Sequence, residues 1–517
     1  MPVYQGKGPE EYAQYVEAYF SAGERKLFET ALAIAHDARR AGGRVFIVGG
    51  AVRDEILGTP SDDYELEFYG MDPQDVQRIA ARYGRAKAAG RSFAVLNLML
   101  PTGRHLDLTF PRRDSQVGEK HTDVEVHVDP NLSLKEAARR RDFTIGAMLK
   151  DPFSGEIYDP FGGREDAHKR LLRAVDPVRF ADDPLRPMRG VQFVSRFGLR
   201  VDPATRQLME SMVPKLETLS RERTGGEWAK LLKSSRPSIG LQLMFDLGII
   251  QRLYPELAAL KETSQEIEWH PEGDVWTHTL MVVDAAALLV RRERLDAETA
   301  RIVMWAALAH DLGKPATTAR EDGRVRSKGH EEAGEEPARA FLERLGADKL
   351  LAQKVIALVK DHLWPVMQFM AERDGTPVTD AEIRRLAKRL APATIEELTW
   401  VAQADHAGRG PFPDPREIDQ YLLPEPYEAG HWLRERARTI GVGREKPRPL
   451  LLGRDLLALG FPPGEKIGVV LKLADECRDR VDATREDALA AMKGANTLDD
   501  AADALRTLLP PDASVRH

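Results

Sequence analysis

The segment 45–54 most constrains the fold of this chain of 517 residues, because four apolar residues run directly into two glycines. Such a run predicts a buried strand, and Gly49 and Gly50 predict a tight turn out of it. Glycine leaves no side chain between backbone N–H groups and whatever lies opposite, which suits a triphosphate. A short amphipathic segment with Arg53 and Asp54 follows. The pattern predicts a strand that leads into a phosphate-binding turn.

Acidic residues alternate along the next predicted strand, nine residues further on. Strand side chains alternate between faces, so Asp63, Glu65 and Glu67 project to one side. These carboxylates repel one another unless a cation lies between them. Asp107 lies in a second alternating run and can face the same cleft from a neighbouring strand. A phosphate cradle beside a two-metal carboxylate site predicts phosphoryl or nucleotidyl transfer; the alternative is a strand with a solvated acidic face.

Four motifs occur in an order that resembles the class II tRNA nucleotidyltransferases, which include the CCA-adding enzymes, bacterial poly(A) polymerases and enzymes that add only CC or only A. The motifs are Gly49-Gly50-Ala-Val-Arg53-Asp54, Asp63-x-Glu65, Arg140-Arg141-Asp142-Phe-Thr-Ile and Asp182-Asp183-Pro-Leu-Arg186. This resemblance covers roughly residues 25–250, and a second one, to an HD metal domain, covers about 265–410. The composite is similar to bacterial nucleotidyltransferases that carry an HD domain behind the polymerase.

The first resemblance implies a catalytic site made of Asp63, Glu65 and Asp107. Two Mg²⁺ ions held there would bind the triphosphate and lower the pKa of the attacking 3′-hydroxyl. The family usually has Asp where this chain has Glu65. The additional methylene moves the carboxylate by about an ångström, a shift to which metal geometry is sensitive.

The resemblance also implies a nucleotide-binding set around two basic motifs. Asp142, after Arg140 and Arg141, can accept a hydrogen bond from a ribose 2′-hydroxyl; the alternative is a charge cluster at a helix end. Asp183 and Arg186 are three residues apart on a predicted helix and would share a face. A carboxylate and a guanidinium so placed match the edge that cytosine and adenine share and reject uracil and guanine; the alternative is a helical salt bridge. Asp182, where the family has Glu, and Arg189 complete the predicted set.

The second resemblance rests on six residues in the order of HD domains: His278, His310, Asp311, His330, His362 and Asp405. We expect the first two histidines and both aspartates at one ion, with the other two histidines supporting a second. Mixed imidazole and carboxylate ligation suits a transition metal such as Mn²⁺, Ni²⁺ or Co²⁺. HD domains of this kind hydrolyse phosphomonoesters or cyclic phosphodiesters through metal-bound water. The alternative is a set of structural histidines.

Composition is ordinary for a soluble globular chain, with 30% charged and 42% hydrophobic residues. The single cysteine, Cys477, excludes an internal disulfide and fits a reducing compartment. No secretory signal and no apolar run of membrane-spanning length is visible, so we expect a cytoplasmic protein without membrane contact. The net charge of −7 is compatible with RNA binding, because residues 1–250 carry +1 and the acidic excess lies in 251–517.

The fold class expected from these patterns is α+β. A small mixed β-sheet head, residues 1–175 with its N-terminal helices, precedes a helical neck at 176–264, an HD helical bundle at 265–410 and a C-terminal helical region at 411–517. In the head we predict two helices over 10–41, one helix near 72–83, a mobile loop over 111–133, and strands at 44–48, 63–69, about 92–100 and 104–110. Ser133 and Glu136 predict the capped start of the next helix.

Beyond residue 176 the expected helices are 183–197, 203–218, 221–234 and 237–249. A Pro/Gly-rich link is expected at 408–427, and the last eight residues read as a disordered tail.

The function predicted is template-independent addition of CMP and AMP to the tRNA 3′ end, with Mg²⁺ in the head and a phosphohydrolase in the HD domain. The expected partners are tRNA, ATP and CTP, and no stable protein partner is readable. One alternative is a poly(A) polymerase or an enzyme that adds only CC or only A. Two others are HD hydrolysis beside a degenerate head, and a tRNA-binding protein without catalysis.

Overall fold

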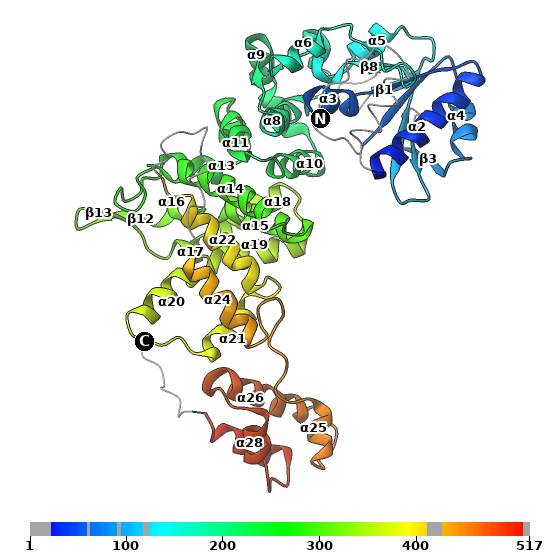
Figure 1. Ribbon diagram of the computed structural model, residues 1–517. Helices are drawn as coiled ribbons and strands as arrows, with labels where there is room; N and C mark the ends of the chain where they lie inside the picture. The colour runs from blue at the N-terminus through cyan, green and yellow to red at the C-terminus, as the bar shows by residue number, and fades with distance from the viewer. Residues whose placement is uncertain (1–21, 59–62, 90–94, 117–123, 411–426, 510–517) are drawn as a thin grey trace. The chain divides into compact units, whose positions relative to one another are not determined.

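The computed structural model describes residues 22–58, 63–89, 95–116, 124–410 and 427–509. These residues form two compact units (Figure 1). The first unit comprises the described residues up to Leu231 together with Ile239–Leu253, and the second comprises Leu232–Ser238 with the described residues from Tyr254 onward. Each unit buries its own apolar side chains.

The described part of the first unit contains a seven-stranded mixed sheet in the order β3-β4-β5-β2-β1-β8-β9. Its strands are β1 (Arg44–Val48), β2 (Glu65–Tyr69), β3 (Arg85–Ala89), β4 (Val95–Met99), β5 (His105–Thr109), β8 (Leu149–Lys150) and β9 (Ile157–Tyr158). β2 runs parallel to β5, whereas β1 is antiparallel to both β2 and β8. The predicted mixed-sheet head is confirmed, and β3, β8 and β9 are strands that the sequence analysis did not predict.

The segment 111–133, predicted as a loop, contains a β-hairpin of β6 (Arg112–Gln116) and β7 (Val124–Val128). The loop prediction is therefore wrong for these two strands. Charged residues and prolines obscured the signal, although valines recur at every second position along β7. Such alternation of a β-branched residue is typical of a strand.

Helices surround the sheet and continue the first unit. They are α2 (Ala22–Arg40), α3 (Gly50–Leu57), α4 (Pro73–Ala80), α5 (Leu134–Arg139), α6 (Gly163–His168), α7 (Pro177–Phe180), α8 (Arg186–Phe197), α9 (Pro203–Met212), α10 (Arg221–Leu232), α11 (Pro237–Asp246) and α12 (Ile249–Leu253). Ser133 caps α5 as predicted, because its hydroxyl accepts a hydrogen bond from the Glu136 backbone N–H at 3.2 Å. The predicted helix ahead of α2 lies outside the described residues.

The second unit is helical apart from one hairpin, β12 (Thr318–Glu321) and β13 (Arg324–Ser327). Its longer helices are α14 (Val275–Arg292), α15 (Ala297–Ala309), α18 (Glu335–Arg344), α19 (Lys349–Asp361), α20 (Trp364–Arg373), α21 (Asp380–Leu390), α22 (Ile395–Ala407) and α24 (Glu428–Thr439). Two short helices, α16 (Lys314–Thr317) and α17 (His330–Ala333), flank the hairpin. α14, α15, α19 and α22 pack against one another and form the centre of this bundle.

The C-terminal part of the second unit has its own apolar cluster, which runs from Leu451 to Leu505. Four helices surround it: α25 (Gly453–Ala458), α26 (Lys466–Val481), α27 (Arg485–Ala491) and α28 (Leu498–Arg506). α26 packs against α21, and the Arg385 guanidinium donates to the Asp479 backbone carbonyl at 2.6 Å. Most of the predicted Pro/Gly-rich link and the predicted tail lie outside the described residues. No helix in the described part of the chain is long and apolar enough to cross a lipid bilayer.

Candidate active sites

Sheet register brings the predicted catalytic carboxylates of the head together. Glu65 on β2 lies opposite Asp107 on β5, and Asp63 lies in the segment just before β2. Burial and the nearby charges of Asp63 and Glu65 raise the pKa of Asp107. The carboxylates of Asp63 and Glu65 thus lie close enough to Asp107 to repel it, and a bound divalent cation would relieve this repulsion. The donor set of oxygens alone fits Mg²⁺.

Glu67, the third acidic residue on this strand face, is compensated by arginine. Its side chain is 1% exposed, and its carboxylate lies 3.2 Å from the Arg140 guanidinium and accepts a hydrogen bond from the Tyr69 hydroxyl at 2.6 Å. The Arg141 guanidinium lies 3.5 Å from the Glu65 carboxylate. Burial alone would raise the pKa of Glu65, but these two arginines lower it. Arg140 and Arg141 thus contact the acidic strand in this structure.

Gly49 precedes α3 with a φ of 69°, in the region that favours glycine. A Cβ atom there would lie 2.9 Å from Arg141 Nη1 and 3.0 Å from Glu65 Oε2. Any larger residue would therefore displace the groups beside the carboxylates. Gly50 begins α3, so the predicted phosphate turn does lead into a helix N-terminus.

Arg53 and Asp54 connect α3 to α8 within the first unit. The Arg53 guanidinium lies 4.8 Å from the ring centroid of Phe193 and 4.6 Å from that of Phe197. Its Nε donates to Asp54 at 2.8 Å, and Arg196 of α8 lies 3.5 Å from the same carboxylate. Both side chains are buried, so they brace the turn that carries the two glycines.

Asp142, predicted to bind ribose, is held by α8 and the backbone. It accepts hydrogen bonds from Arg189 Nε at 2.6 Å and from the Phe143 N–H at 2.8 Å. Burial alone would raise the pKa of Asp142, but Arg189 and these hydrogen bonds lower it. Asp142 is therefore an ionised acceptor beside Arg189, which lies on the same helix as Arg186.

Asp183 and Arg186 do not share a helix face, so that prediction is wrong. α8 begins at Arg186, and Asp183 lies in the turn before it. There the Asp183 carboxylate accepts a hydrogen bond from the Leu185 N–H at 3.0 Å. Pro184 also disfavours helical geometry at the residue that precedes it. Arg186 instead donates to the backbone carbonyls of Arg179 and Arg140, both at 2.7 Å.

Arg223 of α10, which the sequence did not indicate, contacts both oxygens of the Asp183 carboxylate at 2.9 and 3.1 Å. Asp182 lies exposed in the same turn as Asp183. No local pattern links Arg223 to a residue forty positions earlier, and only the packing of the helices brings the two together.

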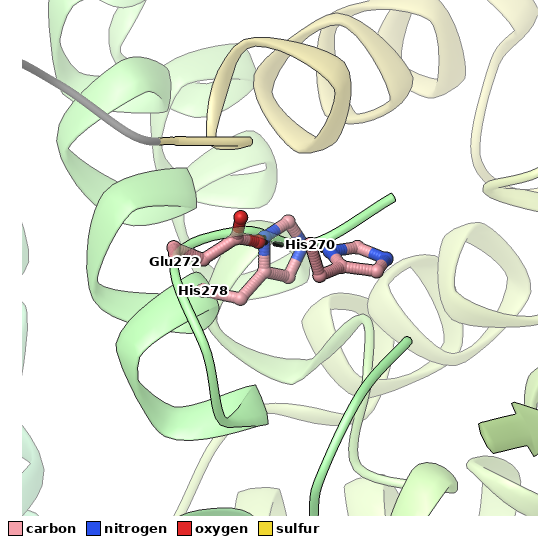
Figure 2. Close-up of side chains that lie close together, drawn as sticks. All are labelled: His270, Glu272 and His278. Carbon is pink, nitrogen blue, oxygen red and sulfur yellow. Dashed lines mark hydrogen bonds and ion pairs between the residues drawn. The ribbon is translucent and has the colours of Figure 1, made fainter. Parts of the chain in front are cut away.

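In the second unit, the predicted metal ligand His278 lies near the start of α14, beside His270 and Glu272 of the preceding turn (Figure 2). The Glu272 carboxylate lies 2.8 Å from His270 Nδ1 and 2.9 Å from His278 Nδ1. Burial alone would raise the pKa of Glu272, but the hydrogen bonds from these imidazoles lower this pKa to about 2. The sequence analysis assigned no role to His270 or Glu272.

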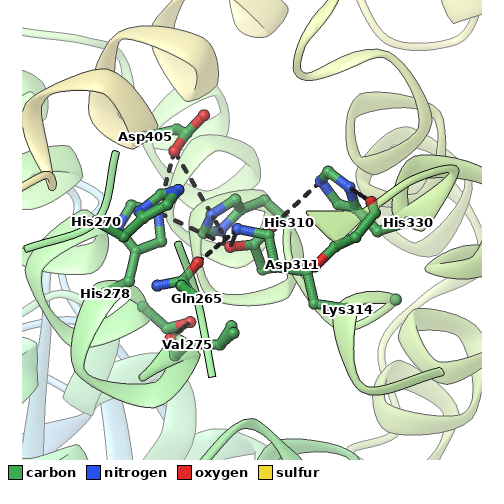
Figure 3. A network of polar contacts seen from close by, with 12 residues as sticks. Gln265, His270, Val275, His278, His310, Asp311, Lys314, His330 and Asp405 are labelled. Atoms are coloured by element: carbon green, nitrogen blue, oxygen red, sulfur yellow. Dashed lines mark hydrogen bonds and ion pairs between the residues drawn. The ribbon is translucent and has the colours of Figure 1, made fainter. Parts of the chain in front are cut away.

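All six predicted ligands converge in the buried interior of the helical bundle. Figure 3 shows five of them, His278, His310, Asp311, His330 and Asp405. His278 Nε2 lies 3.0 Å from Asp405, and His330 Nε2 lies 3.3 Å from His362 Nε2. Asp311 lies between these two groups, with its oxygens 3.1 Å from His310 Nε2 and 3.4 Å from His330 Nε2. The ligand atoms form two adjacent groups, one of His278, His310 and Asp405 and the other of Asp311, His330 and His362.

Backbone carbonyls orient three of the imidazoles. The Nδ1 atoms of His310, His330 and His362 lie 2.7–2.8 Å from the carbonyl oxygens of the residues three positions earlier. A protonated Nδ1 leaves the Nε2 lone pair directed into the centre, which is the arrangement of a metal-ligating histidine. Burial and the neighbouring imidazoles lower the pKa of His362 to about 3, so this ligand is neutral at physiological pH.

The centre contains buried polar atoms that the described protein groups do not satisfy. His310 Nε2 and both carboxylate oxygens of Asp311 lack an acceptable hydrogen bond, although Lys314 Nζ lies 2.7 Å from Asp311. An unsatisfied buried polar atom costs about 1–3 kcal/mol. A transition metal would satisfy these atoms, and the imidazole and carboxylate donors fit one.

A pocket of about 260 Å³ opens onto this centre. Its lining includes two cations that the sequence analysis did not assign, Lys314 and Arg409, and the exposed Trp269. Lys314 follows Asp311 by three residues, a spacing that would have been a usable signal. Cations beside a metal centre suit a phosphate group, so the pocket can hold a phosphoester next to the metal ligands.

Three parts of the chain match known families. Residues 45–173 match the poly A polymerase head domain, residues 198–261 match the probable RNA and SrmB-binding site of polymerase A, and residues 275–406 match the HD domain.

Relatives and solved structures extend these matches over most of the chain. The multifunctional CCA protein of Xanthomonas campestris is 35% identical over 371 residues, which is 71% of this chain and 85% of that protein. That of Methylococcus capsulatus is 32% identical over 401 residues, 77% of this chain and 87% of that protein. The fold resembles the Bacillus stearothermophilus CCA-adding enzyme in complex with CTP, with a TM-score of 0.60, 23% identity and coverage of 88% and 93%. It also resembles the Thermotoga maritima CCA-adding enzyme complexed with tRNA, with a TM-score of 0.53, 19% identity and coverage of 96% and 98%.

Proposed function

The chain belongs to the family of the bacterial multifunctional CCA proteins, class II tRNA nucleotidyltransferases with an HD domain, and on this premise we propose that Asp63, Glu65 and Asp107 catalyse nucleotide addition. The chain is an enzyme that adds CMP and AMP to the 3′ end of tRNA without a nucleic-acid template. The observation that supports the catalytic assignment is the β2–β5 register, which puts Glu65 opposite Asp107 beside Asp63.

The carboxylates of the head would hold Mg²⁺, which supplies charge neutralisation of the triphosphate and a lower pKa for the 3′-hydroxyl of tRNA. Gly49 and Gly50 leave room for the phosphates, and α3 presents its N-terminus to them. Asp142 accepts a hydrogen bond from the ribose. CTP and ATP are the nucleotides used, since both offer an exocyclic amine beside a ring acceptor.

Base choice involves a change of partner for Asp183. Its carboxylate contacts Arg223 in this structure, and Arg186 donates to two backbone carbonyls. We propose that the exocyclic amine of an incoming cytosine or adenine donates a hydrogen bond to Asp183, and that Arg186 donates one to the ring nitrogen of the base. The Asp183–Arg223 pair is partly exposed, and exposed ion pairs contribute only about 0–1 kcal/mol, so the exchange costs little.

Transcripts with truncated ends test this function. The full-length protein is incubated with tRNA that lacks A, CA or CCA and with each nucleotide singly, and the 3′ ends are then sequenced. Completion of CCA on all three substrates is the expected result. Addition of only CC, only A or a run of A would assign the chain to another branch of the family, and no addition would leave the head without this activity.

The buried centre supports a second activity, metal-dependent phosphohydrolysis. We propose that His278, His310, Asp311, His330, His362 and Asp405 hold one or two transition-metal ions, such as Mn²⁺, Ni²⁺ or Co²⁺. The ion would supply an activated water at neutral pH. Lys314 and Arg409 would bind the phosphate, and the unsatisfied atoms of His310 and Asp311 are the observation that supports this proposal.

Chelation tests the second activity. Removal of metal should abolish hydrolysis of a phosphomonoester or a 2′,3′-cyclic phosphodiester, and Mn²⁺, Co²⁺ or Ni²⁺ should restore it. If the purified protein contains no transition metal and hydrolyses neither substrate with any of these ions, the histidines are structural.

A further inference from the structure

The turn that precedes α14 contains a buried carboxylate, Glu272, that neither proposed reaction uses. Its side chain is 0% exposed. Besides the two imidazoles, its second oxygen accepts a hydrogen bond from the Gly410 N–H at 3.1 Å. Burial of a carboxylate is unfavourable unless the charge is paired and hydrogen-bonded. Glu272 thus lies close to two imidazole nitrogens and one backbone N–H, beside the proposed metal centre.

His278 differs from the other three histidines of the centre in what holds its Nδ1 atom. His310, His330 and His362 contact backbone carbonyls, whereas His278 contacts the Glu272 carboxylate (Figure 2). This contact turns His278 Nε2 toward Asp405, which lies 3.0 Å away. A carboxylate at the far nitrogen of a ligating histidine fixes its tautomer and increases its basicity as a ligand.

We propose that Glu272 is a positioning residue of the metal centre, which holds His278 in its ligating orientation and holds His270 at the wall of the adjoining pocket. The inference rests on the proposed metal binding by the HD domain. His270 lines the same pocket as Lys314 and Arg409. A single buried carboxylate therefore links a proposed metal ligand to a residue that lines the proposed phosphoester pocket.

The alternative is that His270, Glu272 and His278 themselves hold an ion, since their ligand atoms lie within 4.8 Å of one another. The tautomer of His278 decides between the two. A neutral imidazole has one lone pair, so a His278 whose Nε2 binds an ion in the centre carries its proton on Nδ1. It then presents that proton, not a lone pair, to the Glu272 carboxylate 2.9 Å away.

Co²⁺ binding to the full-length protein tests the proposal. Titration calorimetry and the visible absorption spectrum are recorded in excess Mg²⁺, which saturates the carboxylates of the head. Glu272→Gln preserves the size of the side chain and removes its charge, and Glu272→Asp preserves the charge but shortens the reach. Glu268→Gln is the matched control, because Glu268 lies in the same turn, is half exposed and pairs with Arg324. Near-ultraviolet circular dichroism checks folding.

We expect Glu272→Gln to weaken Co²⁺ binding roughly 10- to 100-fold and to alter the spectrum, since loss of a partner behind a ligating histidine has effects of this size. Glu272→Asp should lose less, and Glu268→Gln should match the wild type. Wild-type affinity in Glu272→Gln, or a larger loss in Glu272→Asp than in Glu272→Gln, would overturn the proposal.

His270→Gln distinguishes the alternative site. It should retain every equivalent of bound Co²⁺ and raise the KM for phosphoester hydrolysis. Loss of one equivalent would show that His270 is a ligand and would overturn the positioning role. If the wild type itself binds no Co²⁺, the proposed metal function fails; if the wild type binds and Glu272→Gln binds equally well, only the role of Glu272 fails.

Discussion

The two candidate sites balance their charges in opposite ways. In the head, the carboxylates of Glu65, Glu67, Asp142 and Asp183 each lie beside an arginine. In the helical bundle, the ligand atoms of His310 and Asp311 have no acceptable hydrogen bond. In the head, arginines therefore compensate the carboxylates, whereas the bundle encloses imidazole and carboxylate atoms that a bound ion would satisfy.

Magnitudes show why this difference suits two kinds of chemistry. The Asp183–Arg223 pair of the head is partly exposed and contributes about 0–1 kcal/mol, so an incoming nucleotide can replace Arg223 at little cost. Each unsatisfied buried atom costs about 1–3 kcal/mol, so the centre of the bundle favours a retained ion. A nucleotidyltransferase must release pyrophosphate and rebind nucleotide at every addition, whereas a hydrolytic centre can keep its metal throughout.

The largest expected effect comes from removing a carboxylate of the head. Asp63→Ala should lower nucleotide addition on the order of a thousandfold, because metal-ion charge stabilisation contributes several kcal/mol to the transition state. Phosphohydrolysis should be unchanged. Asp75→Ala, on the exposed surface of α4, is the control. Incorporation of CMP into tRNA at a near wild-type rate in Asp63→Ala would exclude the two-metal assignment.

The reciprocal change in the bundle should abolish hydrolysis and leave nucleotide addition intact. Asp311 lies between both ligand groups, so Asp311→Ala should lower metal content as well as activity. Asp311→Asn keeps the shape and should also lose metal, whereas Glu336→Ala, on the surface of α18, should not. Elemental analysis and hydrolysis of a 2′,3′-cyclic phosphodiester measure both effects. A variant that loses nucleotide addition too would show that the two sites are coupled.

The smallest expected effect concerns base choice. Arg186→Ala should reduce discrimination of CTP and ATP against UTP and GTP by roughly 1–3 kcal/mol, the contribution of a bidentate contact to a base edge. Single-nucleotide incorporation with each of the four triphosphates measures it. Arg206→Ala is the control, because Arg206 is a partly exposed arginine of the same unit that pairs with Glu210. Unchanged selectivity would show that Arg186 has a structural role only, through its hydrogen bonds to the backbone carbonyls of Arg179 and Arg140.

Local patterns in the sequence determined much of this protein. The strand that ends before Gly49, the alternation in β2 and the cap at Ser133 are each set by neighbours within a few residues. Motif order indicated the family, and the order of histidines and aspartates found in HD domains indicated the six candidate ligands of the bundle. Local signals failed at the β6–β7 hairpin and at Asp183, where a turn and Pro184 delay the start of α8.

Only the tertiary structure decided which charges meet. Arg223 contacts Asp183 from forty residues away, and Glu67 is buried beneath Arg140 although its strand pattern matches that of Glu65. The sequence analysis assigned no role to Glu272, yet the turn before α14 places its carboxylate 2.9 Å from the Nδ1 atom of His278. Periodicity reports the face on which a side chain lies, because it follows from backbone geometry. The partner on that face depends on how distant elements pack, and no local pattern encodes it.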